Sequence, residues 1–246
     1  MEVFGIKIEF EHDLFRSRIA ECRDRKEKGY VCVVDANVIT MTRHDEAYRK
    51  LVRDSYVNTC DGSSIASMVN KIYGTNYRAF NGPDVFAEYI EKNDFKQLLL
   101  GNTVEKFEQI RAKLEVLGKA SDHISYMPVP FAKIDEFDYV GIAEQIKAID
   151  PDIIWVSLGA PKQENFMVRL LPHIERGLMF GIGAAFNFYV GDIAQPKFHI
   201  GALRFIWLDR IIKEPRKQLK RIRTALLNYP PIYREEKKRK KLLEHS

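Results

Sequence analysis

Leu158–Glu164, read as Leu-Gly-Ala-Pro-Lys-Gln-Glu, combines a glycine with polar side chains where an apolar run gives way to an expected helix. Gly159 would permit a ligand to approach the backbone closely, and the helix start offers N–H groups to an anion. Lys162 and Gln163 would then project toward that anion. The alternative is an ordinary strand-to-helix turn with a proline near the first helical position.

Asp61 is the candidate general base. It lies in Asn58–Ser64, where a carboxylate precedes a glycine and two serines. A carboxylate at a strand-to-helix turn can take a proton from a reacting hydroxyl, although a helix cap or an Asp-Gly turn would produce the same pattern. Arg78 precedes the turn Phe80–Asp84. Its planar guanidinium could bind phosphate, or it could form only a surface ion pair.

A second glycine turn, Gly181–Asn187, resembles the phosphate-binding fingerprint of dinucleotide-binding proteins. Phe186 stands where that fingerprint has its third glycine, and the segment lies far from the amino-terminal position that such fingerprints usually take. We interpret it as a tight turn with small residues at a helix start. A nicotinamide-dependent oxidoreductase that uses this turn stays as an alternative.

No residue pattern predicts a metal site. Asp150-Pro151-Asp152 has the spacing of a metal-binding D-x-D. It precedes its expected strand, however, and would lie at the end of the sheet opposite to bound ligands. The six histidines include no i, i+4 pair, and the three cysteines are too widely spaced for a thiolate zinc site or a disulfide framework. We therefore expect neither a metal nor another cofactor.

The expected elements place the candidate turns at one edge of a sheet. Continuous apolar runs at Val31–Val34, Leu98–Leu100, Ile153–Ser157 and Leu178–Ile182 alternate with amphipathic stretches. Strands that are apolar throughout are buried on both faces. This predicts an α/β fold with a Rossmann-like, largely parallel sheet sandwiched by helices. Ligands of such sheets bind beyond the carboxyl ends of the strands, where the candidate turns begin.

Charge is distributed unevenly along the chain. From Arg204 onward there are 14 Lys and Arg against 5 Asp and Glu, whereas the preceding residues have 25 against 29. We divide the chain into an α/β domain with the candidate catalytic turns, residues 1–195, and a basic, amphipathic helical appendage, residues 196–246. We expect the domain to fold alone and the end of the appendage to be disordered. The positive charge indicates an anionic partner: nucleic acid, a membrane surface or a phosphorylated substrate.

The composition excludes several classes of protein. The chain of 246 residues is 46% hydrophobic and 11% aromatic, which excludes wholesale disorder. No stretch approaches the ~18 uncharged apolar residues of a transmembrane helix. Charged residues near the amino terminus argue against a signal peptide. The cysteine usage suits a reducing cytoplasm.

Five segments, taken in order, resemble motifs of the WecG/TagA/CpsF family of glycosyltransferases. The strongest is PDIIWVSLGAPKQENF, Pro151–Phe166, which matches the family's LGxPKQE signature. The resemblance covers about Val31 to Arg216 and includes the asparagine Asn37 after the first long strand. The other four segments are Asn58…Asp61-Gly62, Arg78…Gly82-Pro83-Asp84, Gly181–Gly191 and Trp207–Lys217.

This resemblance implies an inverting, metal-independent glycosyltransferase. Such enzymes move a sugar, a hexosamine or a related one, from a UDP-sugar to a sugar carried on polyprenyl diphosphate at the cytoplasmic face of the membrane. Their products are wall teichoic acid, enterobacterial common antigen, capsule and exopolysaccharide. The resemblance also implies that Asp61 is the catalytic residue, and that the appendage completes the active site and docks on the membrane.

The residues assigned by this resemblance fall into two groups. Catalytic roles are expected for Asp61, Arg78 and Gln163. Substrate-binding roles are expected for Asn37, Asp35, Gly159, Lys162, Gly183, Asn187, Arg210 and Arg216. Two of these depart from the family pattern, because Asp35 stands where relatives often have threonine and Asn187 where aspartate is commoner. Without a metal, the basic side chains and the helix N-termini must offset the charge of the leaving diphosphate.

The expected partners are the UDP-sugar donor, the lipid-linked acceptor and an anionic membrane surface. The basic appendage would then hold the protein on the inner face of the plasma membrane. An alternative of another class is a nucleic-acid-binding protein that uses the appendage. The chain contains no RNP, KH or helix-turn-helix motif, so we expect no nucleic-acid partner. The sequence leaves open the two sugars and the oligomeric state, a homo-oligomer included.

Overall fold

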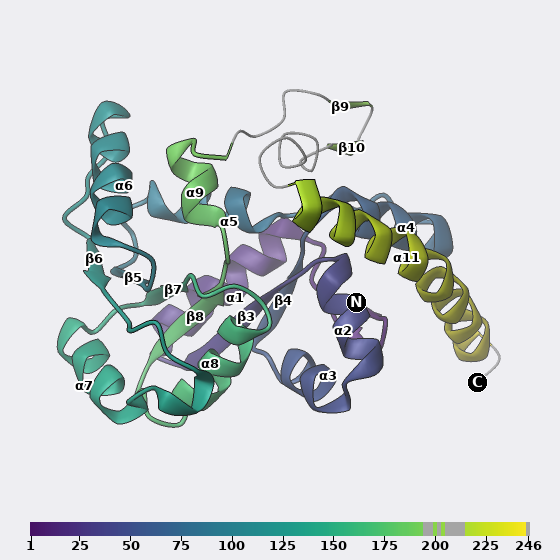
Figure 1. Ribbon diagram of the computed structural model, residues 1–246, viewed down its shortest axis with the longest axis horizontal. Coiled ribbons are helices and arrows are strands. Elements are labelled where there is room, and N and C mark those ends of the chain that lie inside the picture. Colours follow the sequence, from purple (N-terminus) through teal and green to yellow (C-terminus); the bar gives the residue numbers. More distant parts are fainter. Residues whose placement is uncertain (194–198, 201–202, 205–214, 245–246) are drawn as a thin grey trace.

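The computed structural model describes the backbone of residues 1–193, 199–200, 203–204 and 215–244, with side chains for 1–193 and 227–244. Within these residues the chain forms a parallel sheet of six strands with helices on both faces (Figure 1). The predicted α/β fold with a parallel, helix-covered sheet is confirmed.

The sheet is assembled from short strands, each of which is largely buried. Their bounds are β3 (Lys28–Val34), β4 (Val57–Cys60), β5 (Gln97–Leu100), β6 (Ile124–Met127), β7 (Ile153–Val156) and β8 (Gly177–Gly181). The order across the sheet is β4-β3-β8-β7-β5-β6. Successive side chains of a strand point to opposite faces. In β7, therefore, Ile153 and Trp155 join one apolar core while Ile154 and Val156 join the other.

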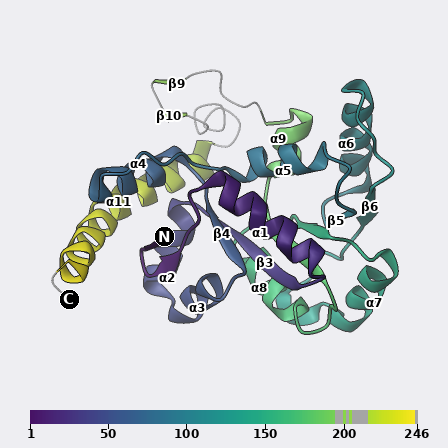
Figure 2. The same ribbon diagram turned by 180° about the vertical axis from the view of Figure 1, so that it is seen from behind.

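Helices form the two outer layers. One face is covered by α1 (His12–Asp24), α5 (Gly82–Ile90), α6 (Val104–Val116) and α9 (Ala185–Val190), and Figure 2 shows α1 in front of the sheet. The other face is covered by α2 (Ala36–His44), α3 (Glu46–Arg53), α4 (Ser63–Tyr73), α7 (Tyr139–Ile149) and α8 (Lys162–Leu170). The single-turn 3₁₀ helix η1 (Ile134–Glu136) precedes α7. Side-chain caps fix four of the helix starts, at Asp35, Asp45, Thr103 and Asp138.

The carboxyl-terminal helix α11 (Pro215–Leu243) lies along the body rather than apart from it. Both views place it beside α4 (Figures 1 and 2), and it packs against α2 and α4. Two small antiparallel hairpins complete the described chain. They pair β1 (Glu2–Val3) with β2 (Ile6–Lys7) and β9 (His199–Ile200) with β10 (Leu203–Arg204). None of the described helices is both long enough and apolar enough to cross a membrane.

Two buried side chains attach α11 to the body. Ile232 and Glu236 are each 3% exposed. The Glu236 carboxylate accepts hydrogen bonds from the Tyr73 hydroxyl at 2.6 Å and from the backbone N–H of Phe4 at 2.8 Å. Because residues four apart lie on one face of a helix, these anchors align. From Pro215 the appendage is helical as far as Leu243 and packs against α2 and α4, and the last two residues, 245–246, lie outside the described residues.

Candidate functional site

The carboxyl edge of the sheet brings the expected site residues into a row. Asp35 follows β3, Asp61 follows β4, Gly159 follows β7 and Gly183 follows β8. Strand β3 lies between β4 and β8, and β7 comes next. The backbone N–H of Asp61 donates to the carbonyl oxygen of Val34 at 2.8 Å. Neighbouring strands are about 4.8 Å apart, so this bond holds the two aspartates on adjoining strands.

Asn81 supports the turn that carries Asp61. Its side-chain oxygen accepts from the Gly62 N–H at 2.9 Å, and its amide nitrogen donates to an Asp84 carboxylate oxygen at 2.8 Å. Gly62 has φ of +101°, a conformation that glycine adopts without strain. Asn81 is 7% exposed, so this bridge is internal. It ties the start of α5 to the turn before α4, and so it holds the backbone next to Asp61.

Arg78 lies at the same edge with its guanidinium exposed. Its backbone is held, because the ring of His12 stacks on Phe80 at 4.4 Å and a ring nitrogen lies 3.2 Å from the Arg78 carbonyl oxygen. Among the residues that the structure describes, no carboxylate forms an ion pair with this arginine. The arginine is therefore held by its backbone, and its exposed side chain has no described counter-ion.

Gln163 joins two of the turns from inside the protein. Its side-chain oxygen accepts from the N–H of Gly159 at 3.1 Å and from the N–H of Gly183 at 3.0 Å, and its amide nitrogen donates to Glu164 at 2.9 Å. A Cβ atom at Gly181 would lie only 3.0 Å from that nitrogen, so glycine makes room for the side chain. Gln163 is 5% exposed, and its contact with a ligand stays a prediction.

The Gly181–Asn187 turn uses its polar backbone groups within the protein. The Gly183 N–H is bonded to Gln163, and its carbonyl oxygen accepts from the Ser157 hydroxyl at 2.8 Å. A dinucleotide fingerprint needs such backbone groups to approach the pyrophosphate. The geometry therefore favours the interpretation as a tight structural turn.

Lys162 is bonded to the segment that follows β6. Its ammonium donates to the carbonyl oxygen of Ala132 at 2.5 Å and lies 5.3 Å and 5.2 Å from the ring centres of Phe131 and Phe137. A cation over aromatic rings and bonded to a carbonyl is held in place. In this position Lys162 fixes the segment between β6 and η1 beside the site.

Glu164 is a buried carboxyl group behind the row. It is 1% exposed, and burial raises its pKa to about 7, while the nearby Asp35 also raises it and the Gln163 bond lowers it. The Tyr48 hydroxyl is close enough to lower the same pKa. Both that hydroxyl and Glu164 Oε2 are nevertheless buried without a hydrogen-bond partner among the described residues. A carboxyl in this environment can hold a proton near neutral pH.

The remaining predicted residues are placed as follows. Asp35 caps α2 by accepting from the Val38 N–H at 2.8 Å. Asn37 is exposed in the first turn of α2, and Asn187 is half-buried on α9. Arg210 lies outside the described residues, and Arg216 lies in α11 where only the backbone is described.

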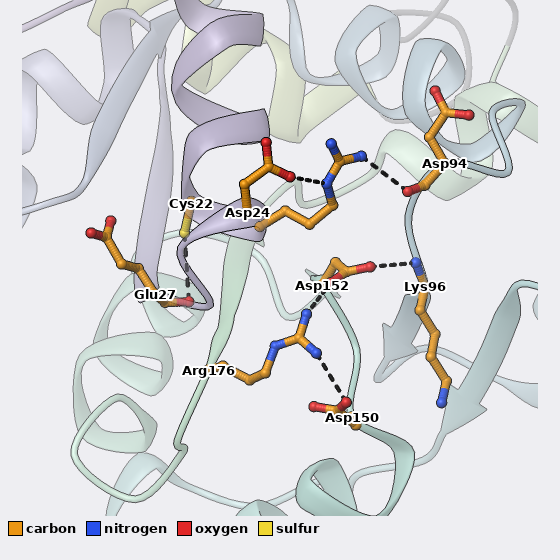
Figure 3. A network of polar contacts seen from close by, with 9 residues as sticks. Cys22, Asp24, Glu27, Asp94, Lys96, Asp150, Asp152 and Arg176 are labelled. Atoms are coloured by element: carbon orange, nitrogen blue, oxygen red, sulfur yellow. Dashed lines mark hydrogen bonds and ion pairs between the residues drawn. The ribbon is translucent and has the colours of Figure 1, made fainter.

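The D-x-D pattern lies at the opposite, amino edge of the sheet (Figure 3). Arg176 forms ion pairs with Asp150, at 2.9 Å, and with Asp152, whose other oxygen accepts from the Lys96 N–H at 2.8 Å. These bonds tie the starts of β5, β7 and β8 together. Among the described residues, no group of three or more His, Cys, Asp or Glu is arranged to hold a metal ion.

Three residues at the site were not predicted from the sequence: Asn81, Tyr48 and Glu164. A signal for Glu164 was present, because it precedes Met167 by three residues and so falls on the buried face of α8. Tyr48 likewise precedes the buried Val52 by four residues. Asn81 gave no such signal, since a single asparagine before a glycine is typical of many turns.

Comparison with known proteins identifies the family of the chain. The model of the glycosyl transferase WecG/TagA/CpsF family matches residues 1–242. Three similar proteins are named N-acetylglucosaminyldiphosphoundecaprenol N-acetyl-beta-D-mannosaminyltransferase. The Bacillus spizizenii W23 protein is 20% identical over 78% of this chain and 74% of its own. The Staphylococcus aureus MW2 protein is 22% identical over 86% and 82%, and the Bacillus subtilis 168 protein 21% over 78% and 74%. The chain belongs to the WecG/TagA/CpsF family and is a glycosyltransferase.

Proposed function

We propose that the protein transfers a hexosamine or related sugar from a UDP-sugar to a sugar linked to polyprenyl diphosphate. The reaction would invert the anomeric carbon and need no metal, and it would serve the synthesis of a bacterial cell-surface polysaccharide. The observation that carries the proposal is the placement of Asp61, Asp35 and Arg78 at one edge of the sheet. The names of the relatives, which contain a diphosphoundecaprenol acceptor, support it.

Asp61 would act as the general base. The acceptor hydroxyl attacks the anomeric carbon of the donor, and Asp61 takes the hydroxyl proton. The bond between that carbon and the diphosphate oxygen breaks, and its electron pair leaves with UDP. Attack from the side opposite the leaving group inverts the configuration. The backbone bond of Asp61 to Val34 and the bridge through Asn81 keep the carboxylate at the edge for this step.

Charge on the departing diphosphate would be offset by the chain itself. Arg78 provides an exposed guanidinium at the site, and guanidinium binds phosphate oxygens in pairs. Helices α4 and α8 begin at the same edge without a side-chain cap. Their first N–H groups can therefore donate to an anion. We assign the same role to Arg210 and Arg216 of the appendage.

The appendage would bring the enzyme to its lipid-linked acceptor. Residues 215–243 contain 11 Lys and Arg against 2 Glu, and basic residues near an anionic surface contribute ~1 kcal/mol each. We therefore propose peripheral binding at the inner face of the plasma membrane. Co-sedimentation with anionic liposomes, compared with binding to duplex DNA and RNA, tests this. Stronger binding to nucleic acid would contradict it.

A transfer assay tests the reaction. The full chain is incubated with a panel of UDP-sugars and an N-acetylglucosaminyl prenyl diphosphate, with EDTA or with Mg²⁺. We expect one donor to give UDP and disaccharide product in equal amounts, with inverted configuration by NMR, at similar rates in both conditions. Loss of turnover in EDTA contradicts metal independence, and a retained anomeric configuration contradicts the single displacement.

A further inference from the structure

The carboxyl group of Glu164 lies directly behind the Gln163 amide at the start of α8. Glu164 is 1% exposed, whereas Lys162 and Asn165 on the same turn are only half-buried. Its Oε1 accepts the hydrogen bond from Gln163 at 2.9 Å. Its Oε2 is buried and makes no hydrogen bond of normal geometry among the described residues, and the Tyr48 hydroxyl lies close enough to lower the pKa of this carboxyl. One oxygen is thus used for Gln163, and the other is available to carry a proton.

The groups that face Glu164 come from three other elements. They are the Cys32 thiol on β3, the Tyr48 hydroxyl on α3 and the Asp35 carboxylate in the turn between β3 and α2. None of these is a cation. Ionised Glu164 would therefore be a buried negative charge beside a second carboxylate, which is costly. A neutral acid fits this environment.

The orientation of Gln163 depends on an acceptor at this position. The two ends of a glutamine amide have nearly the same shape, and only the hydrogen-bond partners distinguish them. In the observed orientation the oxygen faces the N–H groups of Gly159 and Gly183. A flipped amide would place donors against donors and would also turn its oxygen toward Glu164. Glu164 Oε1 therefore adds to the two N–H groups in selecting the orientation that holds both turns.

We propose that Glu164, as the neutral acid, is a positioning residue that fixes the Gln163 amide and thereby the turns after β7 and β8. Ionisation of Glu164 would place a second negative charge near Asp35, behind the row of turns, and would oppose binding of the anionic donor in front of that row. This second part rests on the proposed function. Burial raises the pKa of Glu164 to about 7, so the change of state falls within the range of ordinary assays.

Amide hydrogen exchange tests the positioning role without any substrate. In Glu164→Leu the Gln163 amide loses its acceptor, and we expect the Gly159 and Gly183 amides to exchange about tenfold faster. Glu164→Gln keeps an acceptor oxygen and should leave both rates unchanged. Glu144→Gln, an exposed change on α7, is the matched control. Unchanged rates in a folded Glu164→Leu protein overturn the positioning role.

The pH dependence of donor KM tests the charge effect. For the wild-type enzyme we expect KM for the UDP-sugar to rise about tenfold between pH 6 and pH 8.5, because one ionisation then opposes an anionic ligand. In Glu164→Gln the KM should stay within about twofold over this range, with kcat near the wild-type value at pH 6. The same KM profile in both proteins overturns the inference. Altered exchange rates in Glu164→Leu with no transfer from any donor would contradict the proposed function and leave the positioning role intact.

Discussion

Carboxyl groups lie at both edges of the sheet, but their hydrogen-bond partners differ. At the amino edge Asp152 is 14% exposed and is bonded to Arg176 and to a backbone N–H (Figure 3). At the carboxyl edge Glu164 is more deeply buried, and its bonded partner is the neutral amide of Gln163. A carboxylate with a cation and an N–H keeps its charge at little cost. A carboxyl with only neutral partners is driven toward the neutral acid.

The residues at the amino edge have a structural role, whereas those at the carboxyl edge carry the proposed chemistry. The carboxylates of the amino edge join strand starts and use their oxygens for that purpose. At the carboxyl edge, buried amides of Asn81 and Gln163 support the turns. The turn after β4, which carries the half-buried Asp61, is thereby held at the edge. Substitutions at the two edges should therefore differ in whether they change turnover or stability.

The largest effect is expected from Asp61→Asn. The substitution keeps the shape of the side chain and removes its basicity, so kcat should fall by roughly 10²–10⁴. UDP binding should change little, because the base faces the acceptor. Steady-state transfer and calorimetric titration with UDP measure the two quantities. Asp122→Asn, the same change at an exposed position before β6, serves as control. Wild-type turnover of Asp61→Asn at saturating acceptor would remove Asp61 from the mechanism.

The second effect concerns stability and pH at Glu164. Its pKa rises from 4.5 in the unfolded chain to about 7 in the folded protein. Between these two pH values Glu164 is protonated in the folded protein and ionised in the unfolded chain. Protonated Glu164 therefore contributes to the free energy of unfolding below pH 4.5, and this contribution is lost as the pH rises through 7. The loss is about 3 kcal/mol. Denaturant unfolding at pH 5 and pH 8 should show a steeper fall for the wild type than for Glu164→Gln. Parallel pH profiles would mean that Glu164 is ionised at both values.

The sheet and most of its strands could be predicted from the sequence because buried parallel strands are continuously apolar. The run Leu98–Leu100 lies in β5, and Ile153–Ser157 overlaps β7. Strands β4 and β6 were not predicted, because the polar residues Asn58, Thr59 and Ser125 interrupt their apolar pattern. Asn58 is buried because its amide donates to the Val52 carbonyl oxygen at 2.9 Å. Such a tertiary bond leaves no local pattern.

The site could be predicted only as a set of turns. Because every strand is parallel, residues that follow the strands meet at one edge, and this places Asp61 and Gly159 correctly. The direction of each side chain depends on packing between distant segments. Gln163 fits beside Gly181 because that residue lacks a Cβ, and the Lys162 ammonium lies over Phe131 and Phe137. Neither contact follows from the motif itself.

Arg176→Ala should affect stability and leave turnover unchanged. The substitution removes the cation from Asp150 and Asp152, and Asp152 is 14% exposed. An unpaired, mostly buried carboxylate costs about 2 kcal/mol. Denaturant unfolding should show this loss while kcat stays within twofold. Arg111→Ala breaks an exposed pair with Glu108 and should cost less than about 0.5 kcal/mol. A large fall in kcat for the Arg176 variant would show that the amino edge contributes to the chemistry.

The smallest effect is expected from Glu236→Gln. Glu236 is a buried carboxyl group on α11, away from both edges of the sheet. Glu236 accepts from the Tyr73 hydroxyl and the Phe4 N–H, and an amide can replace only one of these two acceptors. The lost hydrogen bond should lower the free energy of unfolding by about 1 kcal/mol, which corresponds to a Tm about 2–4 °C lower for a chain of this size. Turnover and binding to anionic liposomes should be unchanged, because the substitution leaves the exposed basic residues of α11 in place. Glu144→Gln, the same change at an exposed position on α7, is the matched control. A lower kcat for Glu236→Gln at unchanged stability would contradict this prediction. It would mean that the attachment of α11 affects the active site directly.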